Sequence, residues 1–251
     1  MPRATDGKTV MSEEYVTQIE GAYRVVGTRV LLDGVVYSYR FDKSPDSIQR
    51  SFPTLTIAQV HGAIAYYLDH DKEIDRYLIE GEREFEKLKR ASRKAYPGRT
   101  NGILDSNTSA RNETCARTYA WYEKLERNRK EIVALSVGKT CFLADANLNQ
   151  NIVSGVLRQV PEIDFPTAHE ASPHAPIHSE VLHLAADMGR ILVTQDQRTT
   201  PKHFEDFMPL RNSLGVLIVS QESNIEPTID ELILIWKAFD SWEHVGLLLY
   251  L

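Results

Sequence analysis

Apolar residues recur at different spacings in the two halves of the chain. Between residues 44 and 95 they recur three or four positions apart, as on the buried face of a helix. After residue 139 they form short continuous runs that alternate with helical patterns. Such alternation is typical of buried parallel strands joined by helices. The pattern therefore predicts two domains, the first mainly helical and the second an α/β domain with a parallel sheet.

Breaks in the pattern divide the chain into four segments. Residues 1–20 are polar and aperiodic, and we expect them to form a flexible arm. Residues 21–80 form the helical domain. Residues 81–138 are a helical and linking segment, with a loop at 96–117 that is rich in Gly, Asn, Ser and Thr. Residues 139–251 form the α/β domain.

Two helical patterns in the first domain are separated by a short turn. Ser44 and Pro45 are typical of the start of a short helix, and Thr56 can cap a longer helix over residues 56–70. Short helix, turn and longer helix form a helix-turn-helix, whose second helix places its first residues in the DNA major groove. The DNA-binding candidates are then Thr54, Thr56, Gln59, His61 and Arg50. Many small helical domains have the same spacing and bind no DNA.

The stretch 23–41 precedes these helices. It begins with short β-type runs and is expected to continue as a helix with Asp33 as its N-cap. Arg24, Arg29 and Arg40 could contact phosphates from here, as could Arg50, although scattered arginines usually belong to a solvated face.

Two aspartates follow buried strands in the second domain. Asp145 follows the run 141–144, and Asp196 follows the run 191–193. In open α/β sheets the carboxyl ends of the strands face the crevice in which ligands bind. Two carboxylates at that edge suggest a divalent metal site, and Glu180 is the candidate third acid. The alternative is that both aspartates only cap the elements that follow them.

The remaining elements of the second domain can be outlined from the same pattern. Strands are expected at residues 141–144, 162–168, 191–193 and 214–220. Helices are expected to open at Asn147 and to cover residues 178–189, part of 198–210, and 225–245. Four histidines, at 169, 174, 178 and 183, crowd one region. A zinc site there is an alternative, but exposed loop histidines are the simpler interpretation.

Composition adds a contrast in charge. Residues 1–139 carry 23 Lys and Arg against 20 Asp and Glu, whereas residues 140–251 carry 6 against 15. The acidic second half is unsuited to non-specific nucleic-acid binding but suited to holding a cation, and the first half could cover it. Without a long apolar run, an apolar leader or a cysteine framework, we expect a cytoplasmic protein with no membrane partner.

Residues 22–80 carry a resemblance to a known family. GTRVLLDGVVYSY, followed by SPDSIQRSFPTLTIAQVHGAIAYYL, resembles the small winged-helix-type domain of domain of unknown function family 433. That family is linked with VapB-type antitoxins and is often encoded beside a toxin gene. The resemblance implies binding of operator DNA by an autoregulatory repressor, which we expect to act as a homodimer.

A second resemblance covers residues 141–245. FLADANL, EVLHLAADMGRILVTQDQRTTPKHF, GVLIVSQ and DELILIW resemble the PIN-like nuclease domain of domain of unknown function family 5615. The resemblance implies Mg²⁺- or Mn²⁺-dependent cleavage of RNA, the activity of VapC-type toxins. It gives catalytic and metal-binding roles to Asp145, Asp196 and Glu180. Residues beside this site, or altered from the family pattern, are Asn147, His178, Thr194 and Gln195, with His178 in place of an acid and Gln195 in place of a histidine.

Together the two resemblances imply a fused toxin–antitoxin protein of VapBC type, with an autoinhibited endoribonuclease domain. Residues 71–138 are expected to wrap that domain and cover its site in an intramolecular contact. Two alternatives stay open. His178 favours a catalytically inactive DNA-binding regulator that uses the PIN-like domain for dimerisation or sensing. The other alternative is a Mg²⁺ nuclease of RNA processing or repair.

Overall fold

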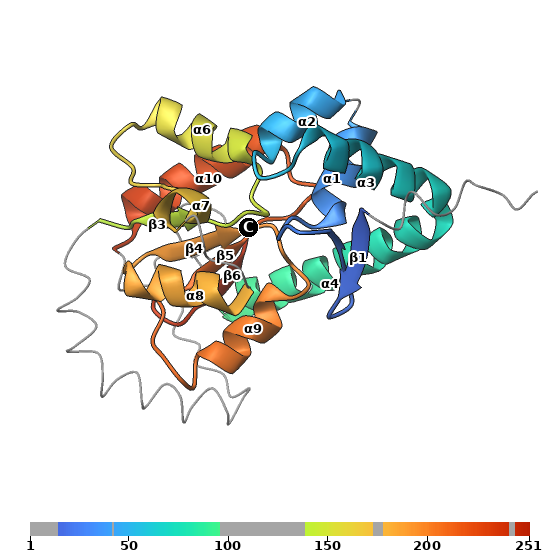
Figure 1. Cartoon of the computed structure of the whole chain (residues 1–251). Helices are drawn as coiled ribbons and strands as arrows, with labels where there is room; N and C mark the ends of the chain where they lie inside the picture. The colour runs from blue at the N-terminus through green and yellow to red at the C-terminus, as the bar shows by residue number, and fades with distance from the viewer. Residues whose placement is uncertain (1–14, 42, 96–138, 173–177, 241–243) are drawn as a thin grey trace, which may run out of the picture.

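The computed structural model describes residues 15–41, 43–95, 139–172, 178–240 and 244–251. The loop predicted at 96–117 and the remainder of the predicted linking segment, up to residue 138, lie outside these residues. Two parts are visible: an N-terminal part (residues 15–95) of a hairpin and helices, and a C-terminal part (residues 139–251) built on a sheet (Figure 1). In the described ranges, no helix has both the length and the apolar character needed to cross a membrane.

The N-terminal part begins with a β-hairpin and continues with helices. Its elements are β1 (Val16–Ile19), β2 (Ala22–Val25), α1 (Leu32–Arg40), α2 (Pro45–Ser51), α3 (Ile57–Asp69) and α4 (Asp71–Ala95). β1 and β2 are antiparallel, and both residues of their turn, Glu20 and Gly21, have positive φ, as a tight two-residue turn requires. The flexible arm predicted over residues 1–20 is therefore corrected, because residues 15–20 belong to the hairpin. Residues 1–14 lie outside the described residues.

Capping groups determine where α2 and α3 begin. The Ser44 side chain accepts a hydrogen bond from a backbone N–H in the first turn of α2. Thr56 and Gln59 form a reciprocal capping box at the start of α3. Both predicted helix starts are confirmed. Asp33, in contrast, lies inside the first turn of α1 and is buried, so the prediction that it caps this helix is wrong.

The C-terminal part is an α/β sandwich, as predicted. Its elements are β3 (Phe142–Ala144), α6 (Gln150–Gln159), α7 (Ala168–Ala171), α8 (His178–Asp187), β4 (Ile191–Thr194), α9 (Thr200–Phe207), β5 (Val216–Ile218), α10 (Ile225–Ala238) and β6 (Leu248–Tyr250). The strands lie in the order β3-β4-β5-β6, and every neighbouring pair is parallel. α6 and α10 cover one face, and α8 and α9 cover the other (Figure 1).

Both faces of this sheet are buried, which explains the continuous apolar runs in the sequence. Phe142 and Ala144 of β3 enter the core shared with α6 and α10. Leu143, between them, enters the core shared with α8 and α9. The other strands divide their side chains between the two cores in the same alternating way.

The predicted strand over residues 162–168 is wrong. This segment runs beside β3, and the carbonyl groups of Asp164 and Pro166 accept hydrogen bonds from β3, but only an isolated bridge forms. Pro166 has no N–H with which to continue a ladder. The fourth strand of the sheet is instead β6, close to the last residue.

Two predicted helix bounds also differ from the structure. α6 begins at Gln150 rather than at Asn147, because Asn149 caps it and Asn147 lies in the turn that follows β3. α10 ends at Ala238 rather than at residue 245, and residues 241–243 lie outside the described residues.

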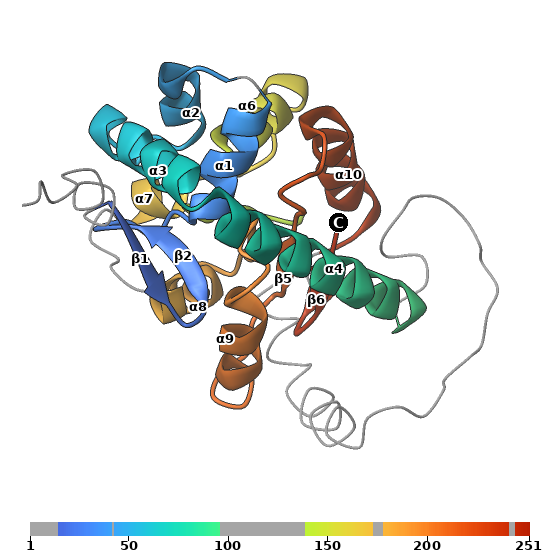
Figure 2. The same cartoon turned by 90° about the vertical axis from the view of Figure 1, so that its right-hand side faces the viewer.

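α4 belongs to both parts of the molecule. The helix is continuous across residues 80 and 81, where the sequence pattern placed a segment boundary. It lies between the N-terminal helices and β6 (Figure 2). Ile74 and Leu78 pack in the N-terminal core. Phe85 packs in the C-terminal core, where its ring lies 5.5 Å from that of Tyr250. The core of the C-terminal part is therefore completed by a side chain from residues 15–95.

Candidate active site

The carboxyl ends of β3 and β4 bring Asp145 and Asp196 to one edge of the sheet. A single hydroxyl links them: Thr194 Oγ1 donates to Asp145 Oδ2 at 2.8 Å and accepts from the backbone N–H of Asp196 at 3.0 Å. Both aspartates are buried, with 4% and 0% of their surface exposed. The two strand-end acids therefore lie side by side, as the sequence pattern predicts.

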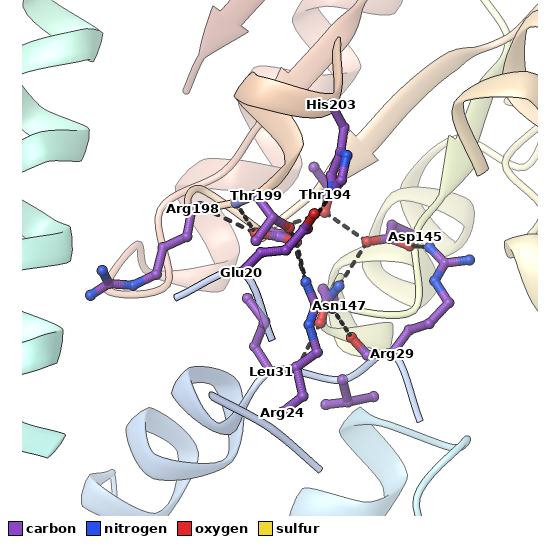
Figure 3. Close-up of polar contacts among 12 residues, drawn as sticks. Glu20, Arg24, Arg29, Leu31, Asp145, Asn147, Thr194, Arg198, Thr199 and His203 are labelled. Atoms are coloured by element: carbon purple, nitrogen blue, oxygen red, sulfur yellow. Dashed lines mark hydrogen bonds and ion pairs between the residues drawn. The ribbon is translucent and has the colours of Figure 1, made fainter. Parts of the chain in front are cut away.

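Asp145 is bonded from both parts of the chain. Asn147 Nδ2 donates to Asp145 Oδ2 at 2.9 Å, and the guanidinium of Arg29 forms an ion pair with Oδ1. Asn147 in turn accepts the backbone N–H of Leu31 at 2.8 Å. Arg29 and Leu31 lie in the connection between β2 and α1, so this connection is docked on the carboxyl edge of the sheet (Figure 3).

Asp196 organises the loop before α9. Its Oδ1 accepts the backbone N–H groups of Arg198 and Thr199 at 3.1 and 2.8 Å, and its Oδ2 accepts the Thr199 hydroxyl. Arg24 of β2 lies 3.6 Å from the same carboxylate and donates to Thr199 Oγ1 at 3.0 Å. Asp196 therefore orders the turn that leads into α9, without capping that helix itself, and is also paired with an arginine of the N-terminal part.

Burial and the neighbouring acids shift the pKa values of the two arginines in opposite directions. The pKa of Arg29 is lowered to about 10, first by burial and then by the positive charge of Arg24, while Asp196 and Glu180 oppose the change. Burial also lowers the pKa of Arg24, with Asp196 as the strongest opposing charge. A pKa of about 10 leaves the Arg29 guanidinium charged near neutral pH, so both aspartates face a cation.

Further contacts between the N-terminal and C-terminal parts surround the Arg29–Asp145 and Arg24–Asp196 ion pairs. Arg198 of the C-terminal part reaches into the N-terminal part, where it lies 3.7 Å from the buried Asp33 and stacks on the ring of Tyr77. The hairpin turn contributes Glu20, whose carboxylate lies 2.8 Å from Nε2 of His203 in α9 (Figure 3). The two parts therefore exchange charged side chains in both directions.

The other predicted residues of this site have different positions. Glu180 is half-buried in the first turn of α8, close enough for its charge to act on Arg29. His178 is the first residue of α8. Gln195 does not bond to the acids: it accepts the N–H of Asn149 at 2.9 Å and donates to the carbonyl of Ser220 at 3.2 Å. Gln195 therefore ties the start of α6 to the end of β5.

Oxygen ligands at this edge are of the kind that Mg²⁺ and Mn²⁺ prefer. In the described ranges, however, no three His, Cys, Asp or Glu side chains are placed to hold a metal ion. Asp145, Asp196 and Glu180 do not form a ready three-acid site, and a guanidinium is bonded to the first of them. The Arg29 guanidinium shows that the position beside Asp145 favours a cation, and in this structure an arginine of the same chain provides it.

The DNA-binding candidates divide into two groups. Arg50, Thr54 and His61 are exposed on α2, α3 and the turn between them. Thr56 and Gln59 are used in the capping box, and Gln59 Nε2 also donates to the carbonyl of Val26 at 2.9 Å. Of the possible phosphate contacts, Arg24 and Arg29 are instead paired with Asp196 and Asp145, and Arg40 is paired with Asp75.

The N-terminal part has a family match. Residues 17–67 match the family described as a protein of unknown function, DUF433. This DUF433 segment contains both Arg24 and Arg29 but covers far less than half of the chain, so it characterises the N-terminal part alone. No curated protein and no solved structure matches the chain. Because the PIN-like family gave no match, the resemblance of the C-terminal part to it, and the fusion, stay predictions.

Arg24, Arg29 and Leu31 are the residues of this site whose role the sequence did not predict. Arg24 offered a signal, because it lies inside the apolar run AYRVV and is only 1% exposed in the structure. A charge in a buried strand needs a partner. That partner, Asp196, lies far away in the sequence and could not be identified from spacing.

Proposed function

We propose that the C-terminal part is a Mg²⁺- or Mn²⁺-dependent ribonuclease and that the N-terminal part holds its site closed, in a fused toxin–antitoxin protein of VapBC type. The main support is one observation. Two arginines of the DUF433 segment, Arg29 and Arg24, are paired with the strand-end carboxylates of Asp145 and Asp196.

The chemistry follows from the residues at the carboxyl edge. A divalent ion held by Asp145 and Asp196 would neutralise charge on a phosphodiester and lower the pKa of a bound water. The Thr194 hydroxyl links the Asp145 carboxylate to the backbone of Asp196, and Asn147 orients Asp145. Glu180, at the start of α8, supplies further negative charge beside them. These groups together favour a cation and a phosphate at one place.

Closure differs from the form predicted from the sequence. From the sequence we expect residues 71–138 to cover the site, but the groups of the N-terminal part that are paired with the acids come from β2 and the connection to α1. The described part of the expected cover, α4, contacts β6 and contributes Phe85 to the core. Because the closing group is on the same chain, its effective concentration is on the order of millimolar, which makes the closed state the default.

The test uses the full chain, because the C-terminal part alone lacks Phe85. RNA cleavage with Mn²⁺ is compared for the wild type, Arg29→Met, and Arg29→Met combined with Asp145→Asn. We expect Arg29→Met to cut at least about tenfold faster than the wild type, and the double variant to be inactive. Arg40→Met, which breaks the pair with Asp75 away from the acids, is the matched control. No cleavage by folded Arg29→Met with either Mg²⁺ or Mn²⁺ would reject the nuclease.

A DNA-binding regulator without catalytic activity is the second candidate. It is favoured by the saturation of the acids, since both oxygens of Asp145 and of Asp196 accept hydrogen bonds from the chain. In this case the helix-turn-helix arrangement of α2 and α3 would carry the function, as a dimer on operator DNA. The protein is mixed with the DNA that precedes its own coding sequence, and binding is measured by electrophoretic mobility shift. A shift of this DNA, together with no RNA cleavage by Arg29→Met, would select this candidate.

A further inference from the structure

Arg24 and Arg29 occupy the acid edge in different ways. Arg24 is an integral part of the structure: its guanidinium donates to the carbonyl of Arg29 at 3.3 Å and to Thr199 Oγ1 at 3.0 Å, and lies 3.6 Å from Asp196. Its side chain is 1% exposed. Removing it would break its contacts with the connection to α1 and with the loop before α9 together.

Arg29 is held at fewer points. Its guanidinium pairs with Asp145, and its side chain is 12% exposed, the most open of the four side chains in the two pairs. The neighbouring charge of Arg24 repels it. The charges of Asp196 and Glu180 oppose this repulsion. With one ion pair against the two hydrogen bonds and one ion pair of Arg24, the Arg29 guanidinium is still the less firmly held of the two, because burial costs free energy that a single pair only partly returns.

The backbone around Arg29 does not depend on its side chain. Val25 N–H donates to Val30 O at 3.0 Å, Val30 N–H donates to Thr28 Oγ1 at 3.2 Å, and Leu31 N–H donates to Asn147. Arg24 holds the carbonyl of Arg29 from the other side. The Arg29 side chain can therefore leave Asp145 while the connection stays docked.

We propose that Arg29 is a displaceable gate, which a divalent cation replaces at Asp145, whereas Arg24 is a fixed counter-charge that stays on Asp196. This proposal rests on the proposed function, because it concerns the same acids. The Arg29 guanidinium carries one positive charge, whereas the divalent cation that replaces it carries two, beside Asp145, Asn147 and Glu180. Opening then needs neither the separation of the two parts nor the movement of α4.

Binding of Mn²⁺ to the full chain tests the gate without measuring activity. Free Mn²⁺ is followed by electron paramagnetic resonance for the wild type, Arg29→Met, Arg29→Lys and the control Arg40→Met. We expect Arg29→Met to bind Mn²⁺ at least about tenfold more tightly than the wild type. Arg29→Lys keeps the charge and should stay near the wild type, as should Arg40→Met. Asp145→Asn in the Arg29→Met background should abolish the binding.

Amide hydrogen exchange locates the movement. If only the side chain leaves, the amide of Leu31 keeps its hydrogen bond to Asn147 and stays protected when Mn²⁺ binds to the wild type. Loss of protection at Leu31 with Mn²⁺ would overturn the proposal, because the whole connection would then lift.

The two proposals fail in distinguishable ways. Equal Mn²⁺ affinity of the wild type and Arg29→Met would overturn the gate and leave the metal site intact. If folded Arg29→Met binds no Mn²⁺, the metal site of the proposed function fails, and the gate fails with it.

Discussion

The carboxyl edge of the sheet and the surface of α2 and α3 use their polar side chains in opposite ways. At the edge, Asp145 and Asp196 are buried and bonded to groups from both parts of the chain. On α2 and α3, Arg50 and His61 are exposed. The buried edge must first be opened before it can bind anything, whereas the exposed surface needs only a suitable partner. Each variant below tests one side of this difference.

Arg24→Met should have the largest effect on stability. Removing one partner of a buried ion pair leaves the other charge buried, and we expect a loss of about 3–5 kcal/mol in the free energy of unfolding. Urea unfolding measures the loss. Arg40→Met, at a pair whose side chains are 35% and 44% exposed, should cost at most about 1 kcal/mol. Equal losses in the two variants would contradict a structural role for Arg24, and Asp196→Asn should restore part of the stability lost in Arg24→Met.

Asp33→Asn should change how stability depends on pH. Burial raises the pKa of Asp33 to about 6, and Arg198 opposes the rise. Since the unfolded chain has a lower pKa, near about 3.9, the folded state binds the extra proton between these values, and stability falls as pH rises through them.

Relative to the wild type, Asp33→Asn should therefore gain stability between about pH 4 and about pH 7, by up to about 3 kcal/mol. Urea unfolding of both proteins at several pH values measures this gain. A difference that is constant across pH would show that Asp33 titrates alike in the folded and unfolded chains.

Thr56→Ala and Thr54→Ala separate structural from accessible residues at the start of α3. The Thr56 side chain accepts a backbone N–H in the capping box, so its loss should cost about 1 kcal/mol of stability. Thr54 is exposed in the turn, and Thr54→Ala should change stability by less than about 0.5 kcal/mol. Thermal unfolding distinguishes the two, and equal melting temperatures would be evidence against the cap.

Arg50→Ala should leave stability within about 0.5 kcal/mol of the wild type, because Arg50 is exposed on α2. If α2 and α3 bind DNA, the change should weaken binding and reduce the slope of log affinity against log salt by about 1. Arg76→Ala, at an exposed position on α4, is the control. An unchanged salt slope for Arg50→Ala would exclude Arg50 from a phosphate contact.

The features that could be predicted are those fixed by local pattern. The starts of α2 and α3 follow from Ser44 and Thr56, whose caps are short-range. The approach of Asp145 to Asp196 follows because they come one and two residues after the ends of neighbouring parallel strands.

The features that could not be predicted depend on long-range packing. The partners of Arg24 and Arg29 are set by docking between distant segments. Asp33 looks like a cap in sequence but is buried because Arg198 and Tyr77 reach it. β6 has only three residues, too few for a clear strand pattern, and it forms because β5 offers an edge.

The helix α4 determines what would happen if the gene were divided in two. An open reading frame ending after Ala95 would encode a product that carries Phe85, a core residue of the product beginning at Lys139. The two polypeptides would then bury an aromatic ring between them and assemble as a stable heterodimer rather than meet only at an accessible surface. The first product would then be a subunit that completes the core of the second, and losing it would lower the stability of the second.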